Sequence, residues 1–476
     1  MNLTPNRTKI IATVGPAIES REMIAALIRA GVNIFRLNLS HGDEQKHKAV
    51  IELVQSVNDE LGTTVGLLAD LQGPKIRTGK VPGGTVLLPE GHELILTTDN
   101  VECTADLVSI SYEQFARDVA EGDHVLIDDG KLELRVMEKI DDTRVRAKVI
   151  YGGLLSSKKG VNMPHTRISE PSLTESDKQN LRWVLDCDIQ WIALSFVRKA
   201  DDMRELRGII NYHNKDVRII AKIERPEALE EIDSIIEASD GIMVARGDLG
   251  VELPMERIPM IQKHITRKSM AAYKPVIIAT QMMESMISHF RPTRAEATDV
   301  ANAVFDGADA VMLSAETSVG QFPVKVVEAM RDIIAEVEKD PSIYNREVKP
   351  DKDSPSYLSD AICYNAANIA MHVNARAILG MTRSGYTAFM LASQRPGASI
   401  HIFTDSQQLI KTLSLVWGVR AFYYNRFEST DKTIAEVQEI LKEKGLIIRG
   451  DIVLNTGSMP LGSRSKTNML KIGVVR

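Results

Sequence analysis

The sequence predicts an α/β protein built on a (β/α)8 barrel, interrupted by an inserted antiparallel β domain and followed by a C-terminal α/β domain. Eight apolar runs are each followed by helix-length amphipathic sequence, except between residues 72 and 171, where short Val- and Gly-rich runs take over. A loose polar segment at 348–355 precedes the last alternation. The 476 residues are enough for about two to four domains.

The predicted barrel spans residues 1–71 and 172–346. Its strands are the apolar runs 9–14, 33–39, 64–71, 191–196, 217–223, 241–245, 275–280 and 308–313. Parallel strands joined by helices close into a barrel of about 250 residues, whose active site lies at the C-terminal strand ends. Polar residues at those ends are therefore the candidates for chemistry.

The inserted domain, 72–171, has short alternating runs such as 93–97, 124–127 and 145–150, which predict antiparallel strands. It leaves after the third barrel strand and returns before the fourth. Both junctions therefore lie at the predicted catalytic rim, where the insertion can act as a lid.

The C-terminal domain, 347–476, is predicted as a small α/β layer. Its expected helices are 357–372 and 386–394, and its expected strands are 377–381, 400–403, 451–454 and 469–475.

Composition excludes several function classes. A net charge of -6 and a pI of about 6.0 argue against a nucleic-acid-binding surface. No apolar run approaches the roughly 18 residues of a membrane span, and the N-terminus lacks an apolar signal core. The three cysteines are widely separated, so neither a disulfide framework nor a zinc site is indicated. We expect a cytoplasmic protein.

The stretch 217–252 contains two apolar runs that each end in charge. Lys222 and Glu224 point the same way because side chains alternate along a strand, and Asp248 closes the second run. Burying such charges is unfavourable unless they pair or bind a metal. One interpretation is a structural ion pair on Lys222. The other is a divalent cation on Glu224 and Asp248, with Lys222 beside it to bind an anionic substrate.

Other polar residues fall at the remaining strand ends, and three of them, Arg36, Asn38 and Ser40, are predicted on one face of the second strand. The rest are Asp70, Lys75, Arg77, Thr280, Ser314 and Glu316. Converging positive charges beside two carboxylates favour phosphoryl transfer. The sequence has no phosphate-loop motif, so we expect side chains and the lid to hold any nucleotide.

Several motifs in combination resemble the pyruvate kinase family over nearly the whole chain. They are Phe35-Arg-Leu-Asn-Leu-Ser-His-Gly, Ala221-Lys-Ile-Glu, Met243-Val-Ala-Arg-Gly-Asp-Leu-Gly-Val-Glu and Ala279-Thr-Gln-Met-Met-Glu-Ser-Met. The resemblance implies a TIM barrel with an antiparallel β-barrel lid and a C-terminal regulatory domain. It also implies transfer of the phosphoryl group of phosphoenolpyruvate to ADP, giving pyruvate and ATP, by a homotetramer.

The resemblance also implies residue roles. Arg36 and Lys222 would contact the phosphoryl group, and Thr280 would stand where the enolate is protonated. The backbone at Gly247 and Asp248 would bind the substrate carboxylate. The remaining roles implied are Mg²⁺ or Mn²⁺ on Glu224 and Asp248, and nucleotide contacts at Arg77 and Lys159.

In potassium-requiring relatives, the positions of Asn38, Ser40, Asp70 and Leu71 hold K⁺. Those relatives read Asp-Thr-Lys-Gly-Pro-Glu, whereas this chain reads Asp70-Leu-Gln-Gly-Pro-Lys75. An ammonium at Lys75 can supply the positive field otherwise lent by K⁺ and would repel the cation. We predict that K⁺ is not required. The alternative is that Lys75 turns to solvent or to ADP and the potassium site survives.

A phosphate-effector site is expected in the C-terminal domain, because a hydroxyl-rich loop follows its first strand and precedes a helix. The resemblance assigns to it Thr382, Arg383, Ser384, Gly385, Tyr386, Thr387 and Arg464. Ser458 stands where relatives activated by fructose bisphosphate commonly have tryptophan. This favours a sugar monophosphate or nucleotide monophosphate. The alternative is an ordinary strand-to-helix turn.

Two competing functions remain open at this stage. A metal-dependent lyase could stabilise a pyruvate enolate on the same carboxylates, but it would not need Lys222, Arg77 or the lid. Arg246-Gly-Asp248 also matches an adhesion tripeptide, although such a motif belongs on an exposed loop and here it ends an apolar strand.

Overall fold

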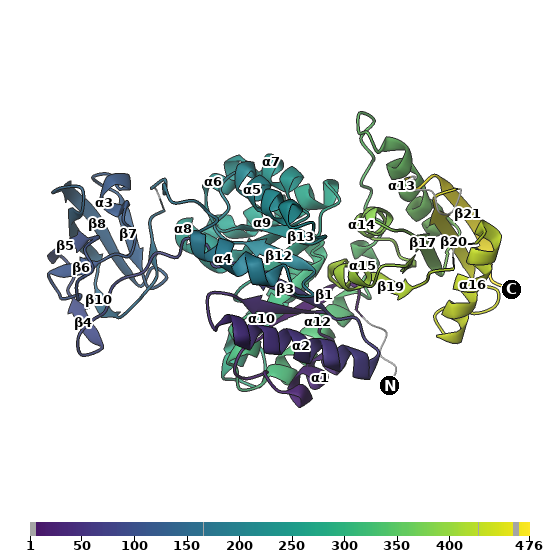
Figure 1. The fold of residues 1–476 in the computed structure, drawn as a ribbon, viewed down its shortest axis with the longest axis horizontal. Coiled ribbons are helices and arrows are strands. Elements are labelled where there is room, and N and C mark those ends of the chain that lie inside the picture. Colours follow the sequence, from purple (N-terminus) through teal and green to yellow (C-terminus); the bar gives the residue numbers. More distant parts are fainter. Residues whose placement is uncertain (1–5, 165, 427, 460–465) are drawn as a thin grey trace.

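The computed structural model describes residues 6–164, 166–426, 428–459 and 466–476. Three units lie in a row, with the inserted β domain at one end, the barrel in the middle and the C-terminal domain at the other end (Figure 1). The predicted fold class is confirmed.

The central unit is a closed barrel of eight parallel strands, in the order β1-β16-β15-β14-β13-β12-β3-β2. Its strands are β1 (Lys9–Thr13), β2 (Ile34–Asn38), β3 (Gly66–Asp70), β12 (Trp191–Leu194), β13 (Arg218–Ile223), β14 (Gly241–Ala245), β15 (Val276–Ala279) and β16 (Ala310–Leu313). Each coincides with one of the eight predicted runs, because strands buried on both faces appear in sequence as short continuous apolar segments.

Helices surround this barrel (Figure 1). They are α1 (Arg21–Ala30), α2 (Glu44–Leu61), α4 (Glu175–Val184), α5 (Ala200–Tyr212), α6 (Glu227–Glu230), α7 (Ile232–Ala238), α8 (Arg246–Glu252), α9 (Ile258–Ala271), α10 (Arg294–Asp306), α11 (Ala315–Ser318) and α12 (Pro323–Val337). Short 3-10 turns are η1 (Met255–Arg257), η2 (Glu284–Ile287) and η3 (Pro341–Ile343).

Local sequence fixes where the longer helices begin and end. Thr293 and Glu296 form a reciprocal capping box at the start of α10, and Gly307 ends the helix with φ of 99°. This helix carries Asp299, which binds Arg246 after β14. The capping signals therefore position a residue next to the candidate site.

Two apolar layers stabilise the barrel. One lies between strands and helices, and the other fills the interior with Ile11, Leu68, Ile220, Met243 and Ile277. The interior layer also includes Leu415 of the C-terminal domain. In addition, the indole nitrogen of Trp191 donates to the Thr412 carbonyl at 3.1 Å. The C-terminal domain thus closes the end of the barrel opposite the catalytic rim.

The inserted domain has a six-stranded sheet, a two-stranded sheet and one short helix. Its elements are β4 (Thr85–Leu88), β5 (Glu93–Thr97), β6 (Leu107–Ser109), α3 (Phe115–Asp118), β7 (His124–Ile127), β8 (Leu132–Lys139), β9 (Arg144–Tyr151), β10 (Gly153–Ser156) and β11 (Val161–Asn162). All its strand pairs are antiparallel except β5 with β6, so the expectation of wholly antiparallel pairing is corrected there. The sequence did not predict β6, β10 or β11.

The C-terminal domain is a five-stranded sheet in the order β19-β18-β17-β20-β21, with helices packed on it. Its elements are α13 (Tyr357–His372), β17 (Ala377–Met381), α14 (Tyr386–Ser393), β18 (Ser399–Thr404), α15 (Gln407–Thr412), η4 (Leu413–Leu415), β19 (Val419–Tyr423), α16 (Thr430–Glu443), β20 (Ile452–Gly457) and β21 (Met469–Val474). The sequence did not predict α15, β19 or α16.

A buried ion pair joins this domain to the barrel. The Arg395 guanidinium lies 2.9 Å from Asp309, which precedes β16, and donates to the Gly307 carbonyl. Its Cζ atom lies 4.9 Å from the centre of the Trp417 ring. Because Arg395 and Asp309 are both almost fully buried, each charge depends on the other for compensation.

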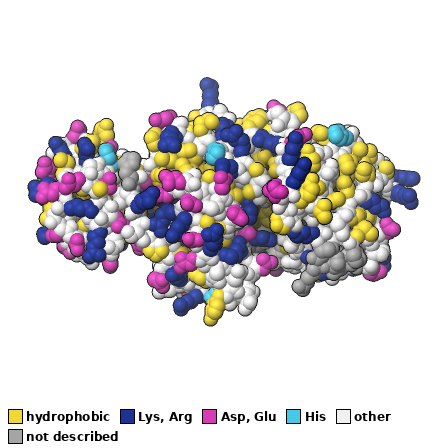
Figure 2. Space-filling view, turned by 90° about the horizontal axis from the view of Figure 1, so that it is seen from above, with side chains coloured by type: hydrophobic (Ala, Val, Ile, Leu, Met, Phe, Trp, Pro, Cys, Tyr) yellow, Lys and Arg dark blue, Asp and Glu magenta, His cyan; other side chains and the backbone are white. Residues whose placement is uncertain are grey.

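The surface shows no bias toward one sign of charge on the face drawn in Figure 2, where basic and acidic side chains of the described residues are interspersed. This agrees with the net charge of -6. No helix within the described ranges is long and apolar enough to cross a membrane.

His401 on β18 makes the stability of the C-terminal domain depend on pH. Its side chain is almost fully buried and neither ring nitrogen has a hydrogen-bond partner among the described residues. Burial lowers the pKa of His401 to about 3, with Arg420 and Arg376 adding to the effect. The unfolded chain binds a proton near pH 6.5 that the folded domain excludes.

At pH values below about 6.5, we therefore expect the free energy of unfolding to decrease by roughly 1.4 kcal/mol for each pH unit. Above that pH, this histidine should have no effect on it. The measurement is denaturant unfolding of the parent and of His401→Leu from pH 5 to 8. His401→Leu should lack the part of the pH dependence of the free energy of unfolding that comes from this histidine. Identical pH dependence in the two proteins would contradict the prediction.

Candidate active site

The candidate site lies at the C-terminal ends of the barrel strands, where the inserted domain joins the barrel. Lys222 lies near the end of β13, and its ammonium is fixed by three groups. Its Nζ lies 2.9 Å from Glu224 Oε1 and 3.2 Å from Asp70 Oδ1, and it donates to Ser195 Oγ at 2.7 Å. These contacts bring β3, the segment after β12, and β13 together around one cation.

Arg36 of β2 joins the same cluster through Asp70. Its Nε donates to Asp70 Oδ2 at 2.7 Å, and its Nη2 approaches the same oxygen at 2.6 Å. Arg36 Nη1 also donates to Thr13 Oγ1 at 3.1 Å, and Thr13 in turn donates to the Leu313 carbonyl. One carboxylate, Asp70, therefore aligns both candidate phosphoryl-binding cations.

The pKa shifts follow from this arrangement. Burial alone would lower the pKa of Lys222, but Asp70 and Glu224 outweigh burial and raise it above its usual value. Burial would likewise raise the pKa of Asp70, yet Lys222 and Arg36 hold it below its usual range. Lys222 is therefore a cation and Asp70 an anion at neutral pH.

Glu224 and Asp248 have the donor chemistry of a divalent-cation site. Glu224 is 1% exposed, and one of its oxygens accepts from the Phe196 amide at 2.8 Å. Burial raises its pKa to about 7; Lys222 opposes this shift, and the nearby charge of Asp248 adds to it. The two carboxylates are thus close enough to repel, which a divalent cation between them would relieve.

Mg²⁺ commonly takes one or two protein carboxylates, with water and substrate oxygens completing its shell. No group of three or more His, Cys, Asp or Glu side chains forms a metal cluster within the part of the chain that the structure describes. A pair that shares the cation with substrate therefore fits this site better than a closed protein cage.

Thr280, just after β15, adopts an unusual backbone conformation. Its φ is 68°, which is uncommon for a β-branched residue, and Gln281 follows with φ of 55°. Thr280 Oγ1 accepts from the Gly247 amide at 2.7 Å, in the first turn of α8. This contact directs the hydroxyl toward the Gly247–Asp248 backbone, where the resemblance expects the substrate carboxylate.

Arg246 does not belong to an exposed adhesion motif. Its side chain is mostly buried and pairs with Asp299 at 2.7 Å, and it also donates to the Thr280 carbonyl at 2.9 Å. Glu316 has a comparable supporting contact, since it accepts from the amides of Ser314 and Met283. Both residues hold the loops after β15 and β16 in place.

The two candidate nucleotide residues come together within the inserted domain. Arg77 pairs across an isolated antiparallel bridge with Gly160, next to Lys159, and its guanidinium donates to the Lys158 carbonyl at 3.0 Å. The Lys159 ammonium lies 2.8 Å from Asp128. That partly exposed ion pair is weak enough for a phosphate to displace it.

The proposed monovalent-cation residues are largely engaged with other groups. Asp70 binds Arg36 and Lys222, the Leu71 carbonyl accepts from Ser195 Oγ at 2.7 Å, and Asn38 Oδ1 accepts from the Ser40 amide at 3.2 Å. The expectation that Ser40 lies on the second strand is corrected, because β2 ends at Asn38 and Ser40 lies in the following turn.

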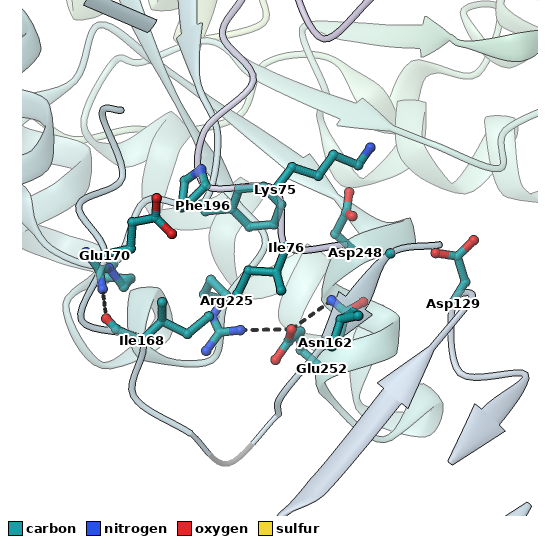
Figure 3. Close-up of a pocket in the computed structure, with 14 residues that line it drawn as sticks. Lys75, Ile76, Asp129, Asn162, Ile168, Glu170, Phe196, Arg225, Asp248 and Glu252 are labelled. Carbon is teal, nitrogen blue, oxygen red and sulfur yellow. Dashed lines mark hydrogen bonds and ion pairs between the residues drawn. The ribbon is translucent and has the colours of Figure 1, made fainter. Parts of the chain in front are cut away.

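Lys75 extends along the pocket between the inserted domain and the barrel, on the same side as Asp248 (Figure 3). Partial burial and Arg77 lower its pKa, while Asp248 and Glu224 oppose that effect. Its ammonium therefore contributes positive charge near both candidate metal carboxylates.

The candidate effector loop lies between β17 and α14, far from this cluster. Gly385 has φ of 82°, and its amide donates to Thr382 Oγ1 at 3.1 Å. Tyr386 donates to Asp360, and Thr387 is buried against Thr467. Arg383 lies 3.8 Å from Asp405. Arg464 lies outside the described residues.

Sequence reasoning missed Ser195, Thr13, Arg225 and Glu252. Ser195 immediately follows β12, so the rule that strand ends carry chemistry could have found it. Thr13 is the last residue of β1 and was open to the same rule. Arg225 and Glu252 carry no comparable signal, because their roles depend on contacts with the inserted domain.

Comparison with known proteins agrees with this geometry. The family model described as the pyruvate kinase barrel domain matches residues 5–327, and that described as the pyruvate kinase alpha/beta domain matches residues 360–473.

The chain belongs to the pyruvate kinase family. It is 43% identical to pyruvate kinase 2 of Synechocystis over 99% of this chain and 80% of that protein. The Staphylococcus epidermidis pyruvate kinase is 40% identical over 98% of this chain and 80% of that protein. A solved pyruvate kinase from Cryptosporidium parvum superposes with a TM-score of 0.92 at 35% identity, covering 99% of this chain and 96% of that one.

Membership in the pyruvate kinase family makes this chain a glycolytic phosphotransferase that acts on phosphoenolpyruvate to give pyruvate. The family binds ADP and ATP and generally uses Mg²⁺ or Mn²⁺. The lyase and adhesion alternatives are therefore set aside.

The shared role of Asp70 can be tested with Asp70→Asn, which keeps the side-chain shape and removes its charge. Without the carboxylate, Arg36 and Lys222 repel each other and lose their alignment, so we expect kcat to fall by about 10²-fold. Steady-state kinetics and circular dichroism would measure this. Asp201→Asn on the surface of α5 is the control, and a kcat within twofold of the parent for Asp70→Asn would contradict the assignment.

Proposed function

We propose that this enzyme transfers the phosphoryl group of phosphoenolpyruvate to ADP, with Lys222 as the cation that stabilises the group in transit. The observation that carries the proposal is the fixation of the Lys222 ammonium by Asp70, Glu224 and Ser195 beside Arg36. A buried, preorganised cation stabilises developing phosphoryl charge without reorganising at the moment of reaction.

The other proposed roles are those that the family resemblance implies. Arg36 would bind the phosphoryl oxygens, and the backbone at Gly247 and Asp248, whose Gly247 amide donates to Thr280 Oγ1 in this structure, would bind the substrate carboxylate. Thr280 would stand where the enolate is protonated. A divalent cation on Glu224 and Asp248 would neutralise the charge of the phosphoryl group and the enolate.

We propose that ADP binds between the barrel mouth and the two cationic residues of the inserted domain, Arg77 and Lys159. The β bridge from Arg77 to Gly160 and the hydrogen bond from the Thr78 amide to the Lys159 carbonyl hold the two backbone segments together. We propose residues 72–171 as the lid domain, residues 1–71 and 172–346 as the catalytic barrel, and residues 347–476 as the regulatory domain. As in the family, we expect a homotetramer located in the cytoplasm.

We expect Lys222→Met to abolish phosphoryl transfer while the fold survives. The replacement is nearly isosteric, but it removes the cation next to the metal carboxylates. Pyruvate formation measures the loss, and thermal unfolding checks the fold. Exchange of the pyruvate methyl protons with solvent should persist better than transfer, because that step depends less on the lysine. Near-normal turnover would overturn the assignment.

We further propose that turnover does not require K⁺, because Lys75 supplies positive charge near the site. An ammonium 4 Å from a monovalent cation repels it by roughly 4 kcal/mol at an effective dielectric of about 20. Turnover should be unchanged, at fixed ionic strength, when tetramethylammonium replaces K⁺, and Lys75→Glu should create a dependence on K⁺. A tenfold or larger rise on adding K⁺ to the parent would falsify this proposal.

We propose that the loop Thr382–Thr387 binds a phosphorylated effector and that Arg218 transmits its effect. Arg218 Nη2 donates to the Ser384 carbonyl at 3.0 Å, and Nη1 lies 3.2 Å from Asp240. Arg218 begins β13, whose other end carries Lys222, and Asp240 precedes β14. A change in the loop can therefore reach two catalytic strands.

A panel of sugar monophosphates, nucleotide monophosphates and fructose bisphosphate should identify a monophosphate that shifts phosphoenolpyruvate cooperativity. In Arg218→Ala, the shift in phosphoenolpyruvate cooperativity should be about tenfold smaller. Binding of the effector, measured by calorimetry, should remain. Arg204→Ala on the exposed face of α5 is the control. If no compound in the panel alters cooperativity, the effector site is wrong, whereas an unchanged shift in Arg218→Ala removes only the proposed route.

A further inference from the structure

The pocket between the inserted domain and the barrel contains a buried cluster that the reaction described above does not use. The cluster consists of Asn162, Glu252 and Arg225 (Figure 3). Asn162 Nδ2 donates to Glu252 Oε1 at 2.9 Å, and Arg225 Nη1 lies 2.9 Å from the same oxygen. A residue of the inserted domain and two residues of the barrel therefore meet on one carboxylate oxygen.

Burial makes these contacts specific. The side chains of Glu252 and Arg225 are 1% and 3% exposed. The other oxygen, Glu252 Oε2, and Arg225 Nε are buried without a hydrogen-bond partner among the described residues. The orientation of Glu252 thus depends on the contacts of its Oε1. The positive charge of Arg225 is compensated by Glu252 and by the half-buried Glu227.

Further contacts tie the returning segment of the inserted domain to the same place. Arg225 Nη2 donates to the Thr166 carbonyl at 3.0 Å, and the Arg198 guanidinium donates to the Ile168 carbonyl. Asn162 belongs to β11, the last strand before the chain returns to the barrel. The cluster therefore lies at the base of the lid, where small rotations become large displacements farther out.

Each member of the cluster lies within four residues, along the chain, of a residue with a proposed role. Asn162 follows Lys159 by three residues, Arg225 follows Glu224 directly, and Glu252 lies one helical turn after Asp248 on α8. The two contacts on Glu252 Oε1 thus link the chain segment of Lys159 with the segments that carry Glu224 and Asp248.

We propose that Asn162, Glu252 and Arg225 are positioning residues that set the distance between the nucleotide held by the lid and the phosphoryl group held by the barrel. This inference rests on the proposed binding of ADP at Arg77 and Lys159. Phosphoryl transfer needs the two substrates aligned closely, so a lid displaced at its base loses rate even when each substrate still binds.

The sharpest variant is Asn162→Asp, which keeps the shape, removes the donor and places a carboxylate against Glu252. We expect KM for ADP to rise and kcat to fall, each by about tenfold, with KM for phosphoenolpyruvate within twofold of the parent. A residue needed only for folding would not produce this split between the two substrates.

Rescue tests the contact directly. In the double variant Asn162→Asp with Glu252→Gln, the glutamine amide can donate to the new carboxylate, so both parameters should return to within about threefold of the parent. Glu252→Gln alone keeps an acceptor for Asn162 but removes the charge that compensates Arg225, so it should also raise KM for ADP. Asn100→Ala on the exposed surface of the inserted domain is the matched control and should change neither parameter.

The variant Lys159→Ala distinguishes a failure of the positioning role from a failure of the nucleotide assignment. If Lys159→Ala raises KM for ADP but Asn162→Asp leaves both parameters unchanged, the positioning role is wrong and the nucleotide assignment stands. If neither variant affects KM for ADP, the proposed nucleotide site fails. Equal losses for both substrates in Asn162→Asp, without rescue by the double variant, would also overturn the positioning role.

Discussion

The structure depends on the mutual compensation of four charges at the mouth of the barrel. Arg36, Asp70, Lys222 and Glu224 are at least about nine-tenths buried, and none would be tolerated there alone. Pairing with an opposite charge compensates each of these buried groups. Asp70 faces two cations and holds Arg36 and Lys222 together, while Glu224 lies near a second carboxylate and favours a divalent cation.

The closed barrel makes this compensation possible because it brings strand ends that are far apart in sequence to one rim. The four charges come from β2, β3 and the end of β13, and the neutral groups that complete the cluster, Thr13 and Ser195, come from β1 and the end of β12. Beneath the rim, the interior apolar layer holds the strands in register, so the charged side chains cannot move apart to reach water.

Different interactions anchor the two ends of the barrel. At the end away from the catalytic rim, a buried ion pair and an arginine stacked on Trp417 fix the C-terminal domain. At the catalytic end, the inserted domain is attached through polar contacts to α8 and to the residue after Glu224. An apolar and ionic interface favours a fixed orientation, whereas a polar interface permits the motion that a lid needs.

The sequence alone determined the eight barrel strands and the insertion after the third, because strand period is a local property of the chain. It also indicated Arg36, Asp70, Lys222, Glu224, Asp248 and Thr280 as candidate site residues, from their positions at strand ends. The sequence did not predict β6, β10 and β11 of the inserted domain or α15, β19 and α16 of the C-terminal domain. Only the tertiary structure decided that Asp70 is shared by Arg36 and Lys222, that Ser195 and Thr13 complete the site, and that Asn162, Arg225 and Glu252 meet beneath the lid. Those facts depend on which buried groups compensate one another across the fold, and residue spacing carries no record of such long-range pairing.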